Sequence, residues 1–217
     1  MQQNTTRVGR LIAGIGRAEL TLLGALTAGH LAVHWYSNLL SLALPFIKED
    51  LNLTDVQVGT IVTVQMGVGS AFVVISGFLA DSFRRQGAAF VSGSVVSLGL
   101  ALFVIGVSPS YGWILVGAGI IGLGTALWHP AAMRSLSLQF PDRRGMALSV
   151  HGVGASVGDA IGPIVVGAII VVADWKLALE LHLIPALLIV FPLWRGLGLM
   201  REVAAERTNL GEYVASL

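Results

Sequence analysis

The sequence of 217 residues contains no cysteine, which excludes disulfides and thiolate metal sites. Charge is scarce too, because Asp, Glu, Lys and Arg make up only 12% of the chain, whereas soluble domains carry about 25%. The formal net charge of +1 gives no basic excess for binding phosphates, so we expect no nucleic-acid partner. A nucleotide-binding loop of the form G-x-x-x-x-G-K-(S/T) is missing as well, so this sequence does not itself hydrolyse ATP.

Apolar residues fill the sequence instead: 55% of it is hydrophobic and its mean hydropathy is +0.81. A soluble core cannot hide so much apolar surface, so the predicted solvent is the lipid bilayer. Each apolar span is close to the roughly 20 residues that a helix needs to cross the hydrocarbon layer. We predict an all-α polytopic membrane protein with a tail over 1–19, a six-helix bundle over 20–195, and a second tail or the start of a linker over 196–217. The six spans are approximately 20–47, 55–80, 87–107, 111–137, 145–172 and 177–195.

Basic residues are distributed unevenly between the two sides of the predicted bundle. Lys48 and Lys176 fall on one side, and ten arginines fall on the other: Arg7, Arg10, Arg17, Arg84, Arg85, Arg143, Arg144, Arg195, Arg201 and Arg207. Because a basic excess marks the cytoplasmic side, both termini are predicted to be cytoplasmic. We expect a multi-pass protein of the cell (inner) membrane.

The turn after the second span, GFLADSFRRQG over 77–87, carries a recognisable spacing. It resembles the signature loop of the major facilitator superfamily, G-x-x-x-D-(R/K)-x-G-(R/K)-(R/K), at Gly77, Asp81 and Arg85. Three positions depart from the pattern: Ser82, Arg84 and Gln86. The resemblance implies a cytoplasmic gating loop in which Asp81, with Arg84 and Arg85 beside it, pairs with basic groups and helix ends. The alternative is a plain charged turn that only fixes the orientation.

The fifth span carries a second resemblance to this superfamily. HGVGASVGDAIGPIVVG looks like its antiporter motif, G-x-x-x-G-P-x-x-G-G, with Val166 in place of one glycine. Small residues allow helices to approach closely in a membrane, and a proline kinks a helix, so the motif predicts packing and a hinge. The matching positions are Gly158, Gly162, Pro163 and Gly167. The stretches GTALWHPAA and PDRRGMALS further resemble fosmidomycin-resistance-type drug exporters, although Ala118 stands where drug–proton antiporters often carry arginine.

Both motifs together identify the chain as the N-terminal half of a twelve-helix transporter. The resemblance implies two three-helix repeats of inverted topology and alternating access that exports a small solute against protons. It also implies a partner, either a C-terminal six-helix half or a second copy, and no cofactor, metal site or catalytic residue. A six-helix scaffold or channel subunit is one alternative. Another is an intramembrane serine protease, with Ser156 as nucleophile and His182 as base.

Polar residues inside the spans are the candidates for solute or proton handling. On a helical wheel His30, His34 and Asn38 fall, with Thr27, Ser37 and Ser41, within an arc of roughly 100°, which predicts the wall of a wet cavity. His129 and His151, in the fourth and fifth spans, have either a structural hydrogen bond or a transport role. Glu180 and His182 are expected to snorkel to the outer interface.

Asp159 is the acid that lies well inside a span. A bare carboxylate there costs at least ~2.5 to 3.5 kcal/mol on insertion scales, so such a residue faces a cavity, pairs or stays protonated. One hypothesis makes Asp159 the proton carrier. The other makes it structural, with a neutral carboxyl donating to a backbone carbonyl that Pro163 leaves free.

Overall fold

The computed structural model describes residues 14–83, 86–108 and 110–197. Most of both predicted tails, together with Arg84 and Arg85 of the predicted gating loop, therefore lie outside the described residues. Within these ranges the chain is helical, which confirms the all-α class. The elements are α2 (Arg17–Asp50), α3 (Asp55–Ser82), α4 (Gly87–Gly106), α5 (Tyr111–Gln139), the 3-10 helix η2 (Pro141–Arg143), α6 (Arg144–Val172), α7 (Trp175–Glu180) and α8 (Leu183–Leu197).

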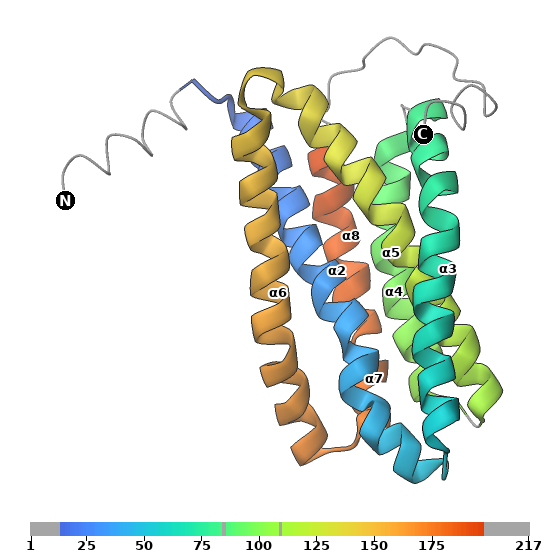
Figure 1. Ribbon diagram of the computed structural model, residues 1–217. Coiled ribbons are helices and arrows are strands. Elements are labelled where there is room, and N and C mark those ends of the chain that lie inside the picture. Colours follow the sequence, from blue (N-terminus) through green and yellow to red (C-terminus); the bar gives the residue numbers. More distant parts are fainter. Residues whose placement is uncertain (1–13, 84–85, 109, 198–217) are drawn as a thin grey trace.

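The long helices run along one common direction and alternate in sense, so that α2 begins and α8 ends at the same end of the bundle (Figure 1). The bounds of α2, α3, α4, α5 and α6 differ from those of the first five apolar spans by at most three residues, at the two ends of α2. The connections are short because local signals stop and start the helices. Before α3, for example, Thr54 and Gln57 form the capping box that their spacing predicts: the Thr54 amide donates to Gln57 Oε1 over 2.9 Å.

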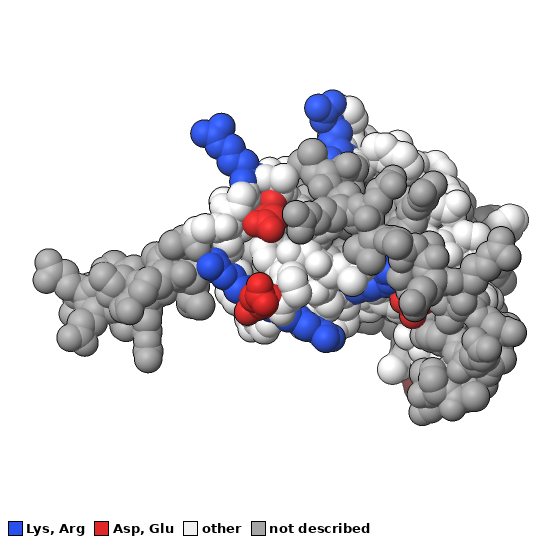
Figure 2. Space-filling view, turned by 90° about the horizontal axis from the view of Figure 1, so that it is seen from above, with Lys and Arg blue, Asp and Glu red and all other residues white. Residues whose placement is uncertain are grey.

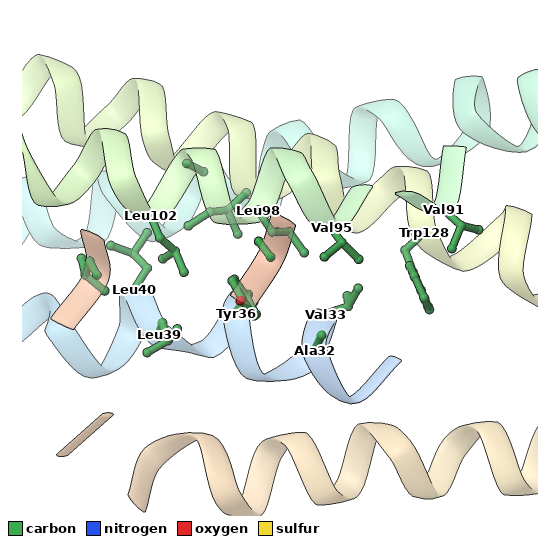
Figure 3. Packing of buried hydrophobic residues seen from close by; sticks show 14 of the residues in the cluster. Ala32, Val33, Tyr36, Leu39, Leu40, Val91, Val95, Leu98, Leu102 and Trp128 are labelled. Carbon is green, nitrogen blue, oxygen red and sulfur yellow. The ribbon is translucent and has the colours of Figure 1, made fainter. Parts of the chain in front are cut away.

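The core lies between α2 and α4, with α5 and α8 beside them. Figure 3 shows Val33, Tyr36 and Leu40 of α2 facing Val95 and Leu98 of α4. These side chains are almost entirely withdrawn from solvent. In a membrane, where lipid is as apolar as leucine, such helices are held together by close packing rather than by the hydrophobic effect. This core fixes the face of α2 that is left to carry polar residues.

Two further interfaces depend on glycine. α2 packs most extensively against α6, and α3 packs most extensively against α5. A Cβ atom at Gly158 of α6 would lie 2.3 Å from the Leu31 carbonyl oxygen, and one at Gly122 of α5 would lie 2.2 Å from the Gln65 carbonyl oxygen. Any larger residue at these positions must therefore push the helices apart.

The sixth predicted span is two helices rather than one. α7 ends at Glu180, and α8 begins at Leu183 after a turn at Leu181 and His182. Pro185 explains the break, because a proline has no N–H to donate and its ring clashes with the carbonyl four residues earlier. The predicted snorkelling of His182 is wrong: the side chain is buried, with 5% of its surface exposed.

Five stretches of the described residues are long and apolar enough to cross a membrane. They are Asp55–Ser82, Gly87–Gly106, Tyr111–Gln139, Pro141–Val172 and Trp175–Arg195, the last of which joins α7 and α8. α2 is not among them, although its 34 residues make it roughly 50 Å long. Its histidines and Asn38 lower its mean hydropathy. The count of six spans therefore stays a prediction.

Basic residues gather at the end of the bundle where α2 begins. Arg17 opens α2, Arg143 and Arg144 join η2 to α6, and Arg195 lies in the last turn of α8. Figure 2 looks onto this end and shows Lys and Arg side chains at several places around it. At the opposite end, Lys48 pairs with Asp55 and Lys176 with Asp50. The unevenness predicted from the sequence is thus present in the folded helices.

Candidate functional site

The polar face of α2 is turned toward α6 and α5. His30, His34 and Asn38 are spaced four residues apart, so they lie above one another on one side of the helix. Gly154 and Gly158 bring α6 into backbone contact with this side, since a Cβ at either would lie 2.2 or 2.3 Å from a carbonyl oxygen of α2. The close approach places the acid of α6 within reach of short side chains on α2.

Asp159 of α6 accepts hydrogen bonds from two residues of α2. His34 Nδ1 lies 3.0 Å from Asp159 Oδ1 and 3.3 Å from Oδ2, and Asn38 Nδ2 donates to Oδ1 over 2.7 Å. The side chains of His34 and Asp159 are 30% and 47% exposed, so the pair lies on an open face of the described bundle. Its hydrogen bonds go to α2 side chains rather than to a backbone carbonyl near Pro163. This arrangement suits an ionised carboxylate, which can only accept.

Four histidine rings meet beside this carboxylate. The ring of His30 lies 4.7 Å from that of His34, 5.4 Å from that of His129 and 3.9 Å from that of His151, measured between centroids. The rings of His30 and His151 are stacked at 8° to each other, and Trp128 stacks on both at 6.3 Å. Three helices, α2, α5 and α6, therefore bring together residues that are up to 121 positions apart.

The hydrogen bonds of these rings assign their tautomers. His30 Nδ1 donates to the carbonyl of His151 over 2.9 Å, and His129 Nδ1 donates to the carbonyl of Thr125 over 3.1 Å. A carbonyl oxygen only accepts, so both rings carry their proton on Nδ1. Nε2 of His30 has no hydrogen-bond partner in the described part of the chain. Both nitrogens of the buried His151 also lack a hydrogen bond of ordinary geometry there.

His182 lies apart from this cluster. Trp35 Nε1 donates to His182 Nε2 over 3.1 Å, and His182 Nδ1 donates to the carbonyl of Ala178. Both ring nitrogens are thus engaged. Ser156 is exposed on α6, with its Oγ 3.5 Å from the carbonyl of Gly152. The geometry gives no support to a pair of Ser156 and His182 as nucleophile and base.

Asp81, from the predicted gating loop, has a partner that the sequence reasoning missed. Arg134 Nε of α5 donates to Asp81 Oδ1 over 3.0 Å, with the two side chains 19% and 38% exposed. Gly77, four residues earlier, is buried on the same helix. The sequence held a signal for this pair, because Arg134 lies near the end of the fourth span and Asp81 near the end of the second, and both ends are predicted to be on the same side of the membrane. The packing of α3 on α5 was not predictable from either span alone.

The antiporter-motif residues divide into two groups. Gly158 and Gly162 are buried, and a Cβ at Gly162 would lie 3.3 Å from the Trp35 ring. Gly167 is exposed, and a methyl group added there would meet no neighbouring helix of the described chain within 4 Å. Pro163 lies within α6, which continues through it to Val172. If Gly167 has a packing role, it must pack against a surface other than the described helices. This role stays a prediction.

Comparison with known proteins identifies the family of the chain. The sequence model of the Major Facilitator Superfamily matches residues 26–212. The chain is 25% identical over 154 residues to the fosmidomycin resistance protein of Escherichia coli K12, covering 71% of this chain and 37% of that protein. It is 27% identical over 168 residues to the puromycin resistance protein of Streptomyces alboniger, covering 76% of this chain and 33% of that protein. The match thus spans about a third of the length of these two relatives.

A solved structure shares the fold. A bacterial homologue of the human lysosomal transporter Spinster, in an inward-facing and unoccupied conformation, superposes with a TM-score of 0.70 at 16% identity. The match covers 89% of this chain and 45% of that one. At this identity the likeness concerns the arrangement of helices alone.

Proposed function

This chain belongs to the major facilitator superfamily, and from that premise we propose that it works as the N-terminal half of a secondary transporter. The transporter moves a small solute across the cell membrane by alternating access and couples export to protons. Both termini are cytoplasmic, since the arginine-rich end of the bundle is the one at which α2 begins and α8 ends.

The observation that carries the proposal is the contact of Asp159 with His34 and Asn38. An ionised carboxylate accepts from both donors, as the 3.0 and 2.7 Å contacts allow. Protonation removes the negative charge that strengthens both hydrogen bonds and turns one carboxyl oxygen into an O–H donor, so the contacts weaken. Because the three groups join α6 to α2, a proton on Asp159 alters the contact between two helices. The second ring nitrogen of an imidazole can accept a proton, so His34 is a suitable partner for such an exchange.

Helix packing supports the inverted-repeat part of the proposal. In such a repeat the first span corresponds to the fourth, the second to the fifth and the third to the sixth. The α2–α6 interface, between the first and fifth spans, then corresponds to the α5–α3 interface, between the fourth and second. These are the two most extensive pairings of the chain. Transporters built from inverted repeats place their sites near the middle of the membrane, between the repeats. The cluster of α2, α5 and α6 draws on the first span of one predicted repeat and two spans of the other, as a site between repeats would.

A second half, or a second copy, covers the open faces in this proposal. Few residues of α3 are buried within the chain: Ile61, Ser76, Gly77 and Ala80. α6 leaves Val153, Ile161 and Ile164 exposed beside the site. Since the matched relatives are more than twice as long as the matched region, the partner surface is expected from the part of the transporter that this chain lacks.

Two resistance proteins among the relatives suggest that the direction of transport is export. A galacturonate transporter among the relatives adds sugar acids to the candidate solutes. The test uses everted membrane vesicles that contain the transporter and carry a preset pH gradient. We expect a solute from a panel with fosmidomycin, puromycin and hexuronates to discharge the gradient, reported by recovery of a quenched acridine dye. A panel in which solutes accumulate without discharging the gradient would overturn proton coupling.

A further inference from the structure

Three histidines from two helices each offer a ring nitrogen to the same small volume. The nitrogens of His30 and His34 on α2 and of His129 on α5 lie within 4.8 Å of one another. We propose that these three residues bind one divalent first-row transition-metal ion, with Zn²⁺ as its representative. The proposal departs from the expectation, drawn from the family resemblance, that the chain has no metal site.

The hydrogen bonds of the three rings are those that metal-binding histidines make. Each Nδ1 is engaged with an acceptor: the carbonyl of His151 for His30, the carboxylate of Asp159 for His34, and the carbonyl of Thr125 for His129. A metal-ligating imidazole almost always donates its second nitrogen to a carbonyl or carboxylate in this way, which fixes the ring and leaves Nε2 for the metal. All three rings therefore keep a free nitrogen lone pair, and none needs a new tautomer to bind an ion.

Burial distinguishes this cluster from a chance gathering of polar residues. His30 is only 7% exposed, yet its Nε2 has no hydrogen-bond partner in the described part of the chain. A buried polar atom without a partner is unfavourable unless a ligand or water satisfies it. Packing accounts for the stacking of His30 on His151, but it does not account for a buried nitrogen without a partner on a ring that lies beside two further imidazoles.

The chemistry of the donors selects the class of ion. Three neutral imidazoles suit zinc, copper, nickel or cobalt, whereas magnesium and calcium need oxygen ligands. Zinc–nitrogen bonds of about 2.0–2.1 Å place the nitrogens of a tetrahedral site roughly 3.4 Å apart. The rings must therefore close by about an ångström, and His34, whose side chain is 30% exposed, has room to rotate. Three protein ligands leave a fourth position open, which suits reversible binding.

The experiment measures metal binding without any transport assay. The chain is purified in detergent without a polyhistidine tag, stripped with a chelator, and titrated with Co²⁺ while ligand-field absorption is recorded. Zn²⁺ is then titrated by calorimetry, with Mg²⁺ as the control ion. We expect one Co²⁺ per chain with the visible bands of a four-coordinate site, displacement by Zn²⁺, and no heat from Mg²⁺.

Variants locate the site. His129→Gln and His34→Gln should each weaken Zn²⁺ binding at least about tenfold. Asp159→Asn replaces the charged acceptor behind His34 by a neutral amide, and it should weaken binding about tenfold with unchanged stoichiometry. His182→Gln is the matched control, because His182 is buried outside the cluster, and it should bind as the unaltered chain does. Thermal unfolding of each variant shows that it is folded.

Two outcomes would overturn the proposal: no saturable Zn²⁺ binding by the unaltered chain, or equal affinity in folded His129→Gln. Either would leave the rings as packing residues. Failure of proton coupling does not affect this test, since no gradient or solute enters it.

Discussion

At the scale of single residues, the proposed proton coupling depends on Asp159. An acid in a membrane helix must be neutralised or surrounded by donors, and here one amide and one imidazole from α2 supply the donors. The contact ties the protonation state of one side chain to the packing of two helices. The proposed proton coupling requires such a link. It can be tested with a substitution that keeps the shape of the Asp159 side chain but cannot take up a proton.

Asp159→Asn in the transporter that contains this chain should abolish proton-driven transport while exchange between equal solute pools survives. An amide keeps the size and an oxygen that accepts from Asn38, but it cannot carry a proton. Both rates are measured in proteoliposomes, with Asp142→Asn, an exposed acid in η2, as the control. Full proton-driven transport by Asp159→Asn would reject the carrier role.

His34→Gln should reduce transport more than His30→Gln does, although His30 is the more buried residue. His34 touches the carboxylate, whereas His30 donates to a backbone carbonyl. Loss of that buried hydrogen bond should destabilise His30→Gln by about 1–3 kcal/mol. Transport rates and thermal unfolding of both variants separate the two effects. A larger transport loss in a fully stable His30→Gln would show that the roles are reversed.

At the scale of helices, glycine determines how close α6 comes to α2 and hence whether Asp159 reaches its partners. Gly154 and Gly158 lie one turn apart and both face carbonyl oxygens of α2. The side chains of His34 and Asn38 are short, so a shift of an ångström or two would separate the donors from the carboxylate. The same principle joins α3 to α5 at Gly122, on the interface that also holds the pair of Asp81 and Arg134.

Gly158→Ala should destabilise the chain by about 1–3 kcal/mol, because the new methyl group overlaps the Leu31 carbonyl and overpacks the interface. Gly167→Ala, nine residues further along α6 in open space, should leave stability unchanged or raise it by about 0.4–1 kcal/mol. Thermal unfolding in one detergent compares them. Equal effects at both positions would mean that α2 and α6 are not in backbone contact.

The pair of Asp81 and Arg134 should show a favourable coupling of about 0.5–1.5 kcal/mol in a double-mutant cycle with Asp81→Asn and Arg134→Gln. Both groups are partly buried where α3 meets α5. The exposed pair of Lys176 and Asp50 is the control and should couple more weakly. Additive effects at Asp81 and Arg134 would mean that this pair does not hold α3 to α5.

At the scale of the whole molecule, the described bundle has one well-filled core and two sparsely covered helices. α3 and α6 carry long apolar stretches of which little is buried. Their positions on either side of the α2 and α5 cluster make them candidates for contact with a second six-helix half. In the proposed transporter, a cavity between two halves needs two walls, and the described helices would form one of them.

This chain alone should therefore show no saturable transport after reconstitution. The matched sample is a transporter that joins the chain to a C-terminal half, tested with the same solute and gradient. Saturable uptake by the monomer would refute the need for a second wall. Uptake by a homodimer, detected after chemical crosslinking, would show that a second copy supplies it.

Local signals in the amino-acid sequence were enough to specify the first five long helices, because apolar length, proline and capping residues act within a few positions of one another. The division of the sixth span into α7 and α8 was not predicted. Local signals also sufficed for the uneven basic charge and for the candidates His30, His34, Asn38 and Asp159. Which of these candidates meet depends on tertiary packing. His34 and Asp159 are 125 residues apart, and their contact requires glycines of α6 to lie against carbonyls of α2. The partner of Asp81 and the burial of His182 escaped sequence reasoning for the same reason: each depends on which helix packs beside it, and helical periodicity in one segment carries no information about its neighbour.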